Sequence, residues 1–376
     1  MRLPSRPPRF ARHGLFLLVM AVVAVAIFSE DDASPESSSR EILAARILPE
    51  VAASDDPWAL AHGLLALEPG SDLLDRWLAT IEGHLIEADD HWRLPLTGVD
   101  GDRGEQHPHL VLRTLALLAG EGRATAASSA LLARLLPAAR HGGGDDGDWR
   151  AINDLAWKLE ALSDLAAGDR AAAAALEPLA HRLLAALVDG DRLVDDFLVA
   201  GLEGKRPDSG TPQTSGTWAY TCGGQHLISA LIAAADAGAI SGDAREQLSV
   251  HVDLYARRLL SELAYRLREE QAAVDAGVSP VRASRRGILE RLKLTGHGLE
   301  ILARARFAGI GEDAFLAETG ATVEAFLKVD MVFLDSEVDP DVTLLGKLRD
   351  TDPGAWERWV GDGCHALHGL RRWRAQ

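Results

Sequence analysis

The sequence predicts an all-α protein, an (α/α)6 toroid of helical hairpins that follows an N-terminal signal peptide or membrane-anchor helix. Ala and Leu dominate the chain and aromatic residues make up only 5%, a balance that favours helices over strands. Apolar residues recur at helical spacing through most of the chain. Helices that are apolar nearly all round alternate with helices that carry one charged face, as the inner and outer helices of hairpins would.

The beginning of the chain has the composition of a targeting segment. Residues 1–28 join a basic stretch to the uncharged run Leu15–Phe28, which at about 14 residues matches a signal-peptide core and is short for a membrane span. Residues 29–40 are polar and predict a flexible linker. A basic flank before the apolar run and an acidic flank after it indicate export, through either a cleaved signal peptide or a single transmembrane anchor. The helical domain, residues 41–376, is therefore expected outside the cytoplasm, periplasmic or anchored to the cytoplasmic membrane.

Capping residues and apolar periodicity predict the helices in order. Asp56 and Pro57 begin the first helix as cap and first-turn residue, and Ser71 caps the second. No segment between the helices shows the alternation typical of a strand. The further helices are predicted at residues 107–119, 125–140, 151–167, 170–188, 219–237, 243–272, 281–308, 312–334 and 354–373.

The net charge of the folded part excludes some classes of binding partner. The formal net charge of the chain is −17. All charged residues before Phe28 are basic, so the net charge of the helical domain is more negative still. A surface of that sign repels phosphate backbones and anionic lipids. We therefore expect no nucleic-acid binding, and membrane contact through the N-terminal segment alone.

Six of the predicted helices open with polar motifs rich in His and Gly and then turn apolar. In a toroid the inner helices run parallel, so their N-terminal ends would gather around one mouth. The residues expected at this mouth are His62, His107, His109, Asp154, Cys222, His226, His297, Glu300, Cys364, His365 and His368.

Imidazole and thiolate groups gathered in this way are the ligands that zinc prefers. We expect Cys222 and Cys364 to bind zinc together with His365 or His297, leaving the fourth position for water or substrate. His62, His297 or Asp154 would then act as the general acid or base. The substrate would be a small molecule, a peptide or a glycan.

Three of these motifs resemble the LanC-type lanthionine cyclases. The motifs are Ala61-His62-Gly63, the Gly-flanked Cys222 and the pair Cys364-His365 on the last inner helix. The resemblance implies an α/α toroid in which Cys222, Cys364 and His365 hold zinc. The chain departs from the family at Thr221, where the family has Trp, and at Ala366, where it has Gly.

The same residues leave two other functions open, and the sequence does not decide whether the protein is an enzyme. Besides binding metal, Cys222 and Cys364 are consistent with two unpaired buried thiols or with a disulfide, and the disulfide would suit a non-catalytic envelope scaffold that binds a partner. Asp154 and Glu300 facing one cavity would suit a glycan-active enzyme of the cell envelope. Glu300 lies on an apolar helix and needs a partner, which Arg304 could supply one turn later.

Overall fold

The computed structural model describes residues 39–67, 72–82, 86–88, 91–93, 109–140, 149–194, 197–198, 216–336, 349 and 351–376. This part of the chain is almost wholly helical. Its helices are α2 (Ser39–Ala53), α3 (Pro57–Ala66), α4 (Leu73–Glu82), α5 (Leu110–Gly120), α6 (Ala126–Ala139), α7 (Trp149–Leu165), α8 (Arg170–Gly190), α10 (Gln225–Asp236), α11 (Gly242–Asp275), α12 (Pro280–Phe307), α13 (Asp313–Ser336) and α15 (Pro353–Arg374). Two 3-10 turns, η2 (Gly216–Ala219) and η3 (Thr221–Gly224), precede α10.

The all-α prediction is confirmed in its main statement, and three local predictions are wrong. The first helix of the domain is α2, which begins inside the segment predicted as linker. Two three-residue strands, β1 (Ile86–Ala88) and β2 (His91–Arg93), form an antiparallel pair where no strand was expected. The helix predicted over 219–237 begins only at Gln225, because the residues before it adopt left-handed backbone conformations.

Several helices begin as their sequences require. Asp56 accepts hydrogen bonds from the backbone nitrogens of Trp58 and Ala59, and Pro57 occupies the first turn of α3. Asp169 caps α8 in the same way, and Asp352 caps α15 ahead of a proline. These side chains satisfy N–H groups that a helix leaves without an internal partner.

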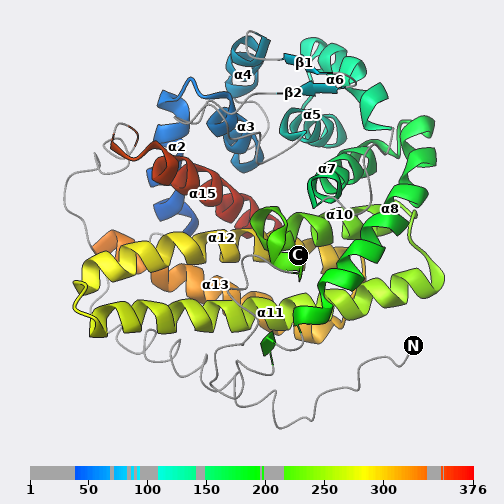
Figure 1. Ribbon diagram of the computed structural model, residues 1–376. Coiled ribbons are helices and arrows are strands. Elements are labelled where there is room, and N and C mark those ends of the chain that lie inside the picture. Colours follow the sequence, from blue (N-terminus) through cyan, green and yellow to red (C-terminus); the bar gives the residue numbers. More distant parts are fainter. Residues whose placement is uncertain are drawn as a thin grey trace.

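Six helices pack against one another in chain order. α3 contacts α5, α5 contacts α7, α7 contacts α10, α10 contacts α12, α12 contacts α15, and α15 contacts α3. The remaining helices lie against these six: α4 on α3, α6 on α5, α8 on α7, and α11 and α13 on α12, while α2 packs against α15 (Figure 1).

The six helices run parallel, as successive contacts between α3 and α15 show. Trp58 meets Gly361, His62 meets His365, and the carbonyl of Leu65 meets His368, so positions on both helices advance together. The same holds for α12 and α15 and for α7 and α10, whose contact pairs also advance in step. Side chains at equivalent depths on these helices therefore meet in layers.

One continuous apolar cluster joins the helices. It extends from Ile42 on α2 to Leu370 on α15 and includes fully buried Trp77 and Trp157. The segment Arg170–Val194, which includes α8, is long and apolar enough to cross a membrane, but it packs on α7 and α10 as an outer helix of the domain does. The apolar run Leu15–Phe28 lies outside the described residues, as does the predicted linker up to residue 38.

Glycines bring α12 and α15 into backbone contact. A Cβ on Gly296 would lie 2.7 Å from the backbone nitrogen of Ala366, and a Cβ on Gly369 would lie 2.6 Å from the carbonyl oxygen of Gly296. Those separations are shorter than a side chain tolerates against backbone that cannot rotate away. The adjacent residues His297 and His365 are therefore held close together.

The close approach predicts the effect of a single methyl group. Gly296→Ala should destabilise the domain by about 1–3 kcal/mol, because overpacking against backbone outweighs the helix propensity of roughly 0.5–1 kcal/mol that Ala adds. The measurement is urea unfolding followed by circular dichroism. Gly354→Ala is the matched control, since its Cβ would meet nothing closer than 3.9 Å. A Gly296→Ala protein as stable as wild type would show that this contact is not needed.

Candidate functional site

Polar residues recur once per turn along one face of α12 and along one face of α15. On α12 they are Lys293, His297, Glu300 and Arg304, and on α15 they are Asp362, His365, His368 and Arg372. Spacings of three and four residues place each set on one face of its helix. Because the helices run parallel, the faces build a layer of histidines and, one turn further along, a layer of arginines and carboxylates.

The histidine layer is compact and buried. His297 and His365 have ring centroids 3.8 Å apart, and His226 lies 5.0 Å from His297. His62 approaches His365 edge-on at 5.2 Å. All four side chains are almost inaccessible to solvent, since no one of these residues is more than 3% exposed. Four imidazoles from α3, α10, α12 and α15 thus meet in the interior.

Glu300 sets the orientation of two of these imidazoles. The Nδ1 of His365 donates to its carboxylate, with both oxygens at 3.1 Å, and the Nδ1 of His297 lies 3.6 Å from Oε2. Burial alone would raise the pKa of Glu300, but His365 and His297 hold that pKa well below its usual range. In the neutral tautomer that donates from Nδ1, Nε2 is the ring nitrogen that carries the lone pair.

Among the described residues, the Nε2 atoms of His297 and His365 have no hydrogen-bond partner. Both nitrogens are buried. A buried polar atom without a partner costs free energy, so native proteins normally satisfy it with a protein group, water or an ion. These two nitrogens are therefore placed to bind something other than protein.

Cys222 enters the site on a strained turn. Its backbone is left-handed (φ 52°), and Gly223 and Gly224 continue in left-handed conformations up to the start of α10. Non-glycine residues rarely adopt this conformation, which is enriched in turns and at active sites. Arg258 secures the turn by donating from Nη2 to the carbonyl of Gly223 at 2.6 Å.

Two overlapping groups of residues have the composition of metal ligands. Cys222, His226 and His297 form the first, and His297, Glu300 and His365 the second. Within each group the ligand atoms all lie within 4.8 Å of one another. Thiolate and imidazole sites of this kind suit zinc, whose bonds to nitrogen and sulfur are about 2.0–2.3 Å long.

Cys364 does not join either group, so the predicted trio of Cys222, Cys364 and His365 is not brought together. Neighbours on a helix point about 100° apart, so with His365 turned inward Cys364 lies in the apolar core, 0% exposed. Burial raises the pKa of the Cys364 thiol, whereas a metal ligand must be a thiolate. No disulfide joins Cys222 and Cys364.

The residues predicted for proton transfer are distributed over two places. His297 lies at the centre of the histidine layer, and His62 lies beside it, where its Nδ1 donates to the carbonyl of Trp58 at 2.8 Å. Asp154 is elsewhere, on α7, where it pairs with His109 at 2.5 Å and with Lys158 at 2.9 Å. His107 lies outside the described residues.

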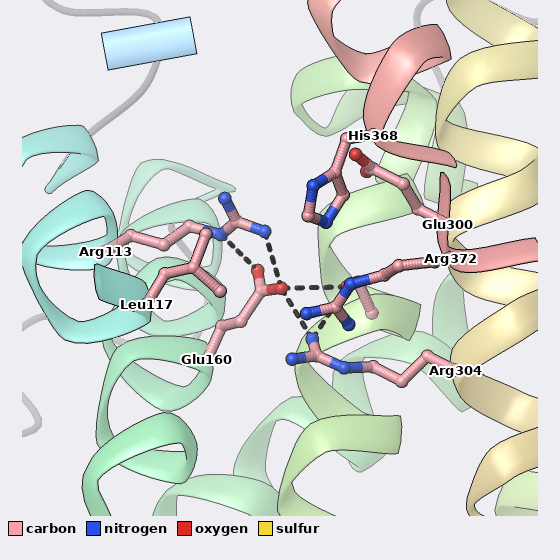
Figure 2. A pocket seen from close by; sticks show the side chains of 8 residues that line it. Arg113, Leu117, Glu160, Glu300, Arg304, His368 and Arg372 are labelled. Atoms are coloured by element: carbon pink, nitrogen blue, oxygen red, sulfur yellow. Dashed lines mark hydrogen bonds and ion pairs between the residues drawn. The ribbon is translucent and has the colours of Figure 1, made fainter. Parts of the chain in front are cut away.

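The next layer is a buried network of charges. Glu160 pairs with Arg113 at 2.8 Å and with Arg304 at 2.7 Å, and it accepts from the hydroxyl of Ser229 at 3.0 Å. Burial acts to raise the pKa of Glu160, but the two guanidinium groups outweigh it and lower the pKa to about 2. Arg304 thus forms its ion pair with Glu160, whereas the sequence suggested Glu300 as its partner. A small pocket lies among these side chains and Glu300, His368 and Arg372 (Figure 2).

The charged layer and the role of His226 escaped the sequence analysis. The signal that could have revealed them is the i, i+3, i+4 repetition of polar residues that continues beyond each histidine motif. The convergence of the motifs was predicted from helix beginnings, yet His297 and His365 lie in the middle of long helices. What brings them together is equal depth on parallel helices.

No protein-family model matches this chain, and neither the curated proteins nor the solved structures contain a match.

The Asp154 ion pairs predict an acid-dependent contribution to stability. Burial acts to raise the pKa of Asp154, but His109 and Lys158 outweigh it and hold the pKa well below its ordinary value. A lowered pKa stabilises the fold above the unfolded pKa of about 4, and that contribution is lost as pH falls toward the folded value. Urea unfolding should show Asp154→Asn less stable than wild type at pH 6, with a difference that narrows at pH 3. A difference independent of pH would contradict the ionised pairing.

Proposed function

We propose that this protein is a zinc-dependent enzyme with an (α/α)6 toroid fold, acting outside the cytoplasm. The observation that carries the proposal is the pair of buried Nε2 atoms on His297 and His365. Both lack a hydrogen-bond partner within the described chain, and both face away from the carboxylate that holds their Nδ1 atoms.

The helix packing supports a toroid. The six parallel helices contact one another in chain order from α3 to α15, and α15 also contacts α3. Most of these six helices are also covered by one of the remaining helices, α2, α4, α6, α8, α11 and α13. In such a ring the polar faces of the inner helices would line the central axis. The histidine layer and the charged layer then lie at two depths of that axis.

The donor set supports zinc. We assign Cys222, His226 and His297 as ligands, because these three form the group that joins thiol and imidazole, with ligand atoms all within 4.8 Å of one another. Three protein ligands leave a fourth position open, as catalytic zinc sites do. Cys222 precedes the N-terminus of α10, where the helix dipole favours thiolate. Lys293, whose pKa is raised chiefly by Cys222, provides a balancing charge.

His365 and Glu300 are assigned as the proton-transfer pair. A carboxylate on Nδ1 orients the imidazole and stabilises it when Nε2 takes a proton. The bound metal would polarise a water molecule or a substrate oxygen or thiol. The ring of His365 lies against the ring of His297, with centroids 3.8 Å apart, so a group bound at His297 would be close to His365. His62, edge-on to His365, lines the same space and helps to exclude water from it.

The other two functions find no support in the contacts. Asp154 pairs with His109 and Lys158, while Glu300 pairs with the histidines and lines a pocket to which Asp154 does not contribute. A glycan-active carboxylate pair therefore has no shared cavity among the described residues. A scaffold held by one disulfide would need a Cys222–Cys364 bond, and no disulfide joins the two residues.

The location outside the cytoplasm rests on the order of charges and apolar residues at the start of the chain. The basic stretch, the apolar run Leu15–Phe28 and the polar segment follow one another as in exported proteins. The acidic net charge of −17 suits a domain attached to the membrane only through that segment.

Metal content tests the proposed centre. Protein purified without chelators should contain about one zinc ion per chain by elemental analysis, and His297→Ala should lose it. His181→Ala is the matched control, because His181 is exposed on α8. Glu300→Gln should weaken zinc binding about 10–100-fold, since outer-shell carboxylates contribute that much. Wild-type protein without stoichiometric metal, and without uptake on titration, would end the proposal.

The two cysteines distinguish this ligand set from the one that the LanC resemblance implies. Cys222→Ser should abolish the thiolate-to-metal absorption of the cobalt-substituted protein, whereas Cys364→Ser should leave it intact. A band weakened in both variants would restore the family's ligand set, in which Cys222 and Cys364 both bind the metal.

Location can be tested by protease accessibility. When the full chain is expressed in a bacterial host, protease added to spheroplasts should digest the helical domain. Leu18→Arg places a charge in the apolar run and should retain the protein inside the cell, protected from protease. Equal protection of wild type and variant would contradict export.

A further inference from the structure

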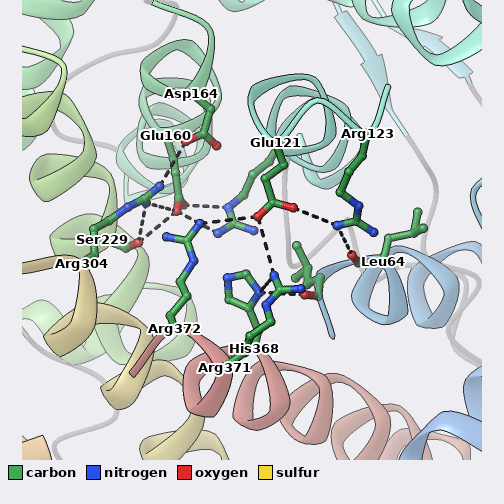
Figure 3. Close-up of polar contacts among 12 residues, drawn as sticks. Leu64, Glu121, Arg123, Glu160, Asp164, Ser229, Arg304, His368, Arg371 and Arg372 are labelled. Atoms are coloured by element: carbon green, nitrogen blue, oxygen red, sulfur yellow. Dashed lines mark hydrogen bonds and ion pairs between the residues drawn. The ribbon is translucent and has the colours of Figure 1, made fainter. Parts of the chain in front are cut away.

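The two sides of the histidine layer are held in different ways. On the side of the charged layer, the inner helices pair with one another: Arg304 of α12 lies 2.7 Å from Glu160 of α7 (Figure 3). Cys222 lies on the opposite side, because it precedes His226 by four residues whereas the charged layer follows the histidines. There the side chains that fix the backbone come from α11, which is an outer helix.

Arg258 of α11 connects the two 3-10 turns that precede α10. Its Nη2 donates to the carbonyl oxygen of Gly223 in η3 at 2.6 Å, and its Nη1 donates to the hydroxyl of Thr217 in η2 at 3.2 Å. The residue is 3% exposed, and its guanidinium lies 4.7 Å from the ring centroid of Trp218. One buried guanidinium therefore fixes η2 and η3, the turn that contains Cys222, relative to each other.

The positive charge of Arg258 is already balanced. Its Nε donates to Oε1 of Glu262, and the same oxygen accepts from Nε1 of Trp218 at 2.8 Å. A guanidinium that is paired in this way still presents its remaining donors in fixed directions, as the fork of an arginine does. We therefore expect Arg258 to act on Cys222 through geometry, and not by supplying charge.

A second residue on the same face of α11 holds the start of α10. Tyr255 lies three positions before Arg258, and its hydroxyl accepts a hydrogen bond from Nε2 of Gln225 at 2.8 Å. Gln225 and Tyr255 are each 2% exposed. Because Gln225 directly precedes His226, this contact fixes the first turn of the helix that carries the imidazole ligand next to Cys222.

We propose that Arg258 is a positioning residue of the zinc centre. By holding the carbonyl of Gly223, it keeps Cys222 in the left-handed conformation in which the thiol lies within 4.8 Å of the ligand nitrogens of His226 and His297. Without that hydrogen bond the strained turn would relax, and the thiol would leave the ligand set. This inference rests on the proposed zinc centre, to which it adds α11 as the helix that holds the cysteine ligand in place.

Metal binding by the purified full-length protein tests this role. Arg258→Gln should weaken zinc affinity about 10–100-fold in competition with a chelator, as the loss of an outer-shell group does. At saturating cobalt, the thiolate-to-metal absorption of the variant should fall relative to its ligand-field bands, because the thiol is displaced while the imidazoles remain. A role in folding alone would lower the melting temperature without changing that ratio.

Two further variants make the test specific. Arg258→Lys keeps the charge beside Glu262 but loses the fork of donors, so it should weaken zinc binding as Arg258→Gln does. Recovery of wild-type affinity in Arg258→Lys would overturn the geometric role. Arg257→Gln removes the same charge from the adjacent position, where the guanidinium lies 5.7 Å from the ring centroid of Phe315, and should bind zinc as wild type does.

The outcomes separate this inference from the proposal on which it rests. Wild-type zinc affinity and an unchanged band ratio in Arg258→Gln would overturn the positioning role and leave the zinc centre intact. Wild-type protein that takes up neither zinc nor cobalt would overturn both.

Discussion

The backbone contact between α12 and α15 determines what the interior of this protein can hold. Gly296 and Gly369 allow the two helices to approach more closely than any residue with a Cβ would permit. At that distance His297 and His365 come together across the interface, and Glu300 reaches both rings. A wider crossing would leave one carboxylate with one imidazole and would admit solvent between the helices. The glycines therefore connect local backbone geometry to the chemistry of the buried site.

Burial raises the free-energy cost of any unpaired polar atom in the histidine layer and in the charged layer. In water, four imidazoles and a group of arginines would be solvated independently of one another. In a low-dielectric interior, a polar atom without a hydrogen-bond partner costs free energy. The polar atoms that have no partner among the described residues therefore indicate where a ligand could bind. In the histidine layer, the atoms without a partner among the described residues include Nε2 of His297 and Nε2 of His365. In the charged layer, Glu160 pairs with Arg113 and Arg304. Glu300 lies between the layers, and its single carboxylate links the proposed zinc centre to the pocket.

Helix content and approximate boundaries could be predicted from the sequence because apolar spacing and capping residues are local signals. Asp56, Asp169 and Asp352 cap helices where such signals place them. The grouping of His62, His226, His297 and His365 was also anticipated, although for an incomplete reason. The rotation of α15 could not be predicted: a Cys-His pair gives no indication of which neighbour faces inward, and His365 does so while Cys364 enters the core. The left-handed turn at Cys222 likewise depends on Arg258, which is distant in the sequence.

The central claim is that the histidine layer binds a metal ion, and anomalous diffraction from crystals of protein purified without chelators tests it most directly. Data collected on both sides of the zinc absorption edge should give one peak next to Nε2 of His297, within bonding distance of Cys222 and His226. The peak should be remote from Cys364. Absence of any peak among the histidines, or a peak bonded to Cys364, would contradict the assignment.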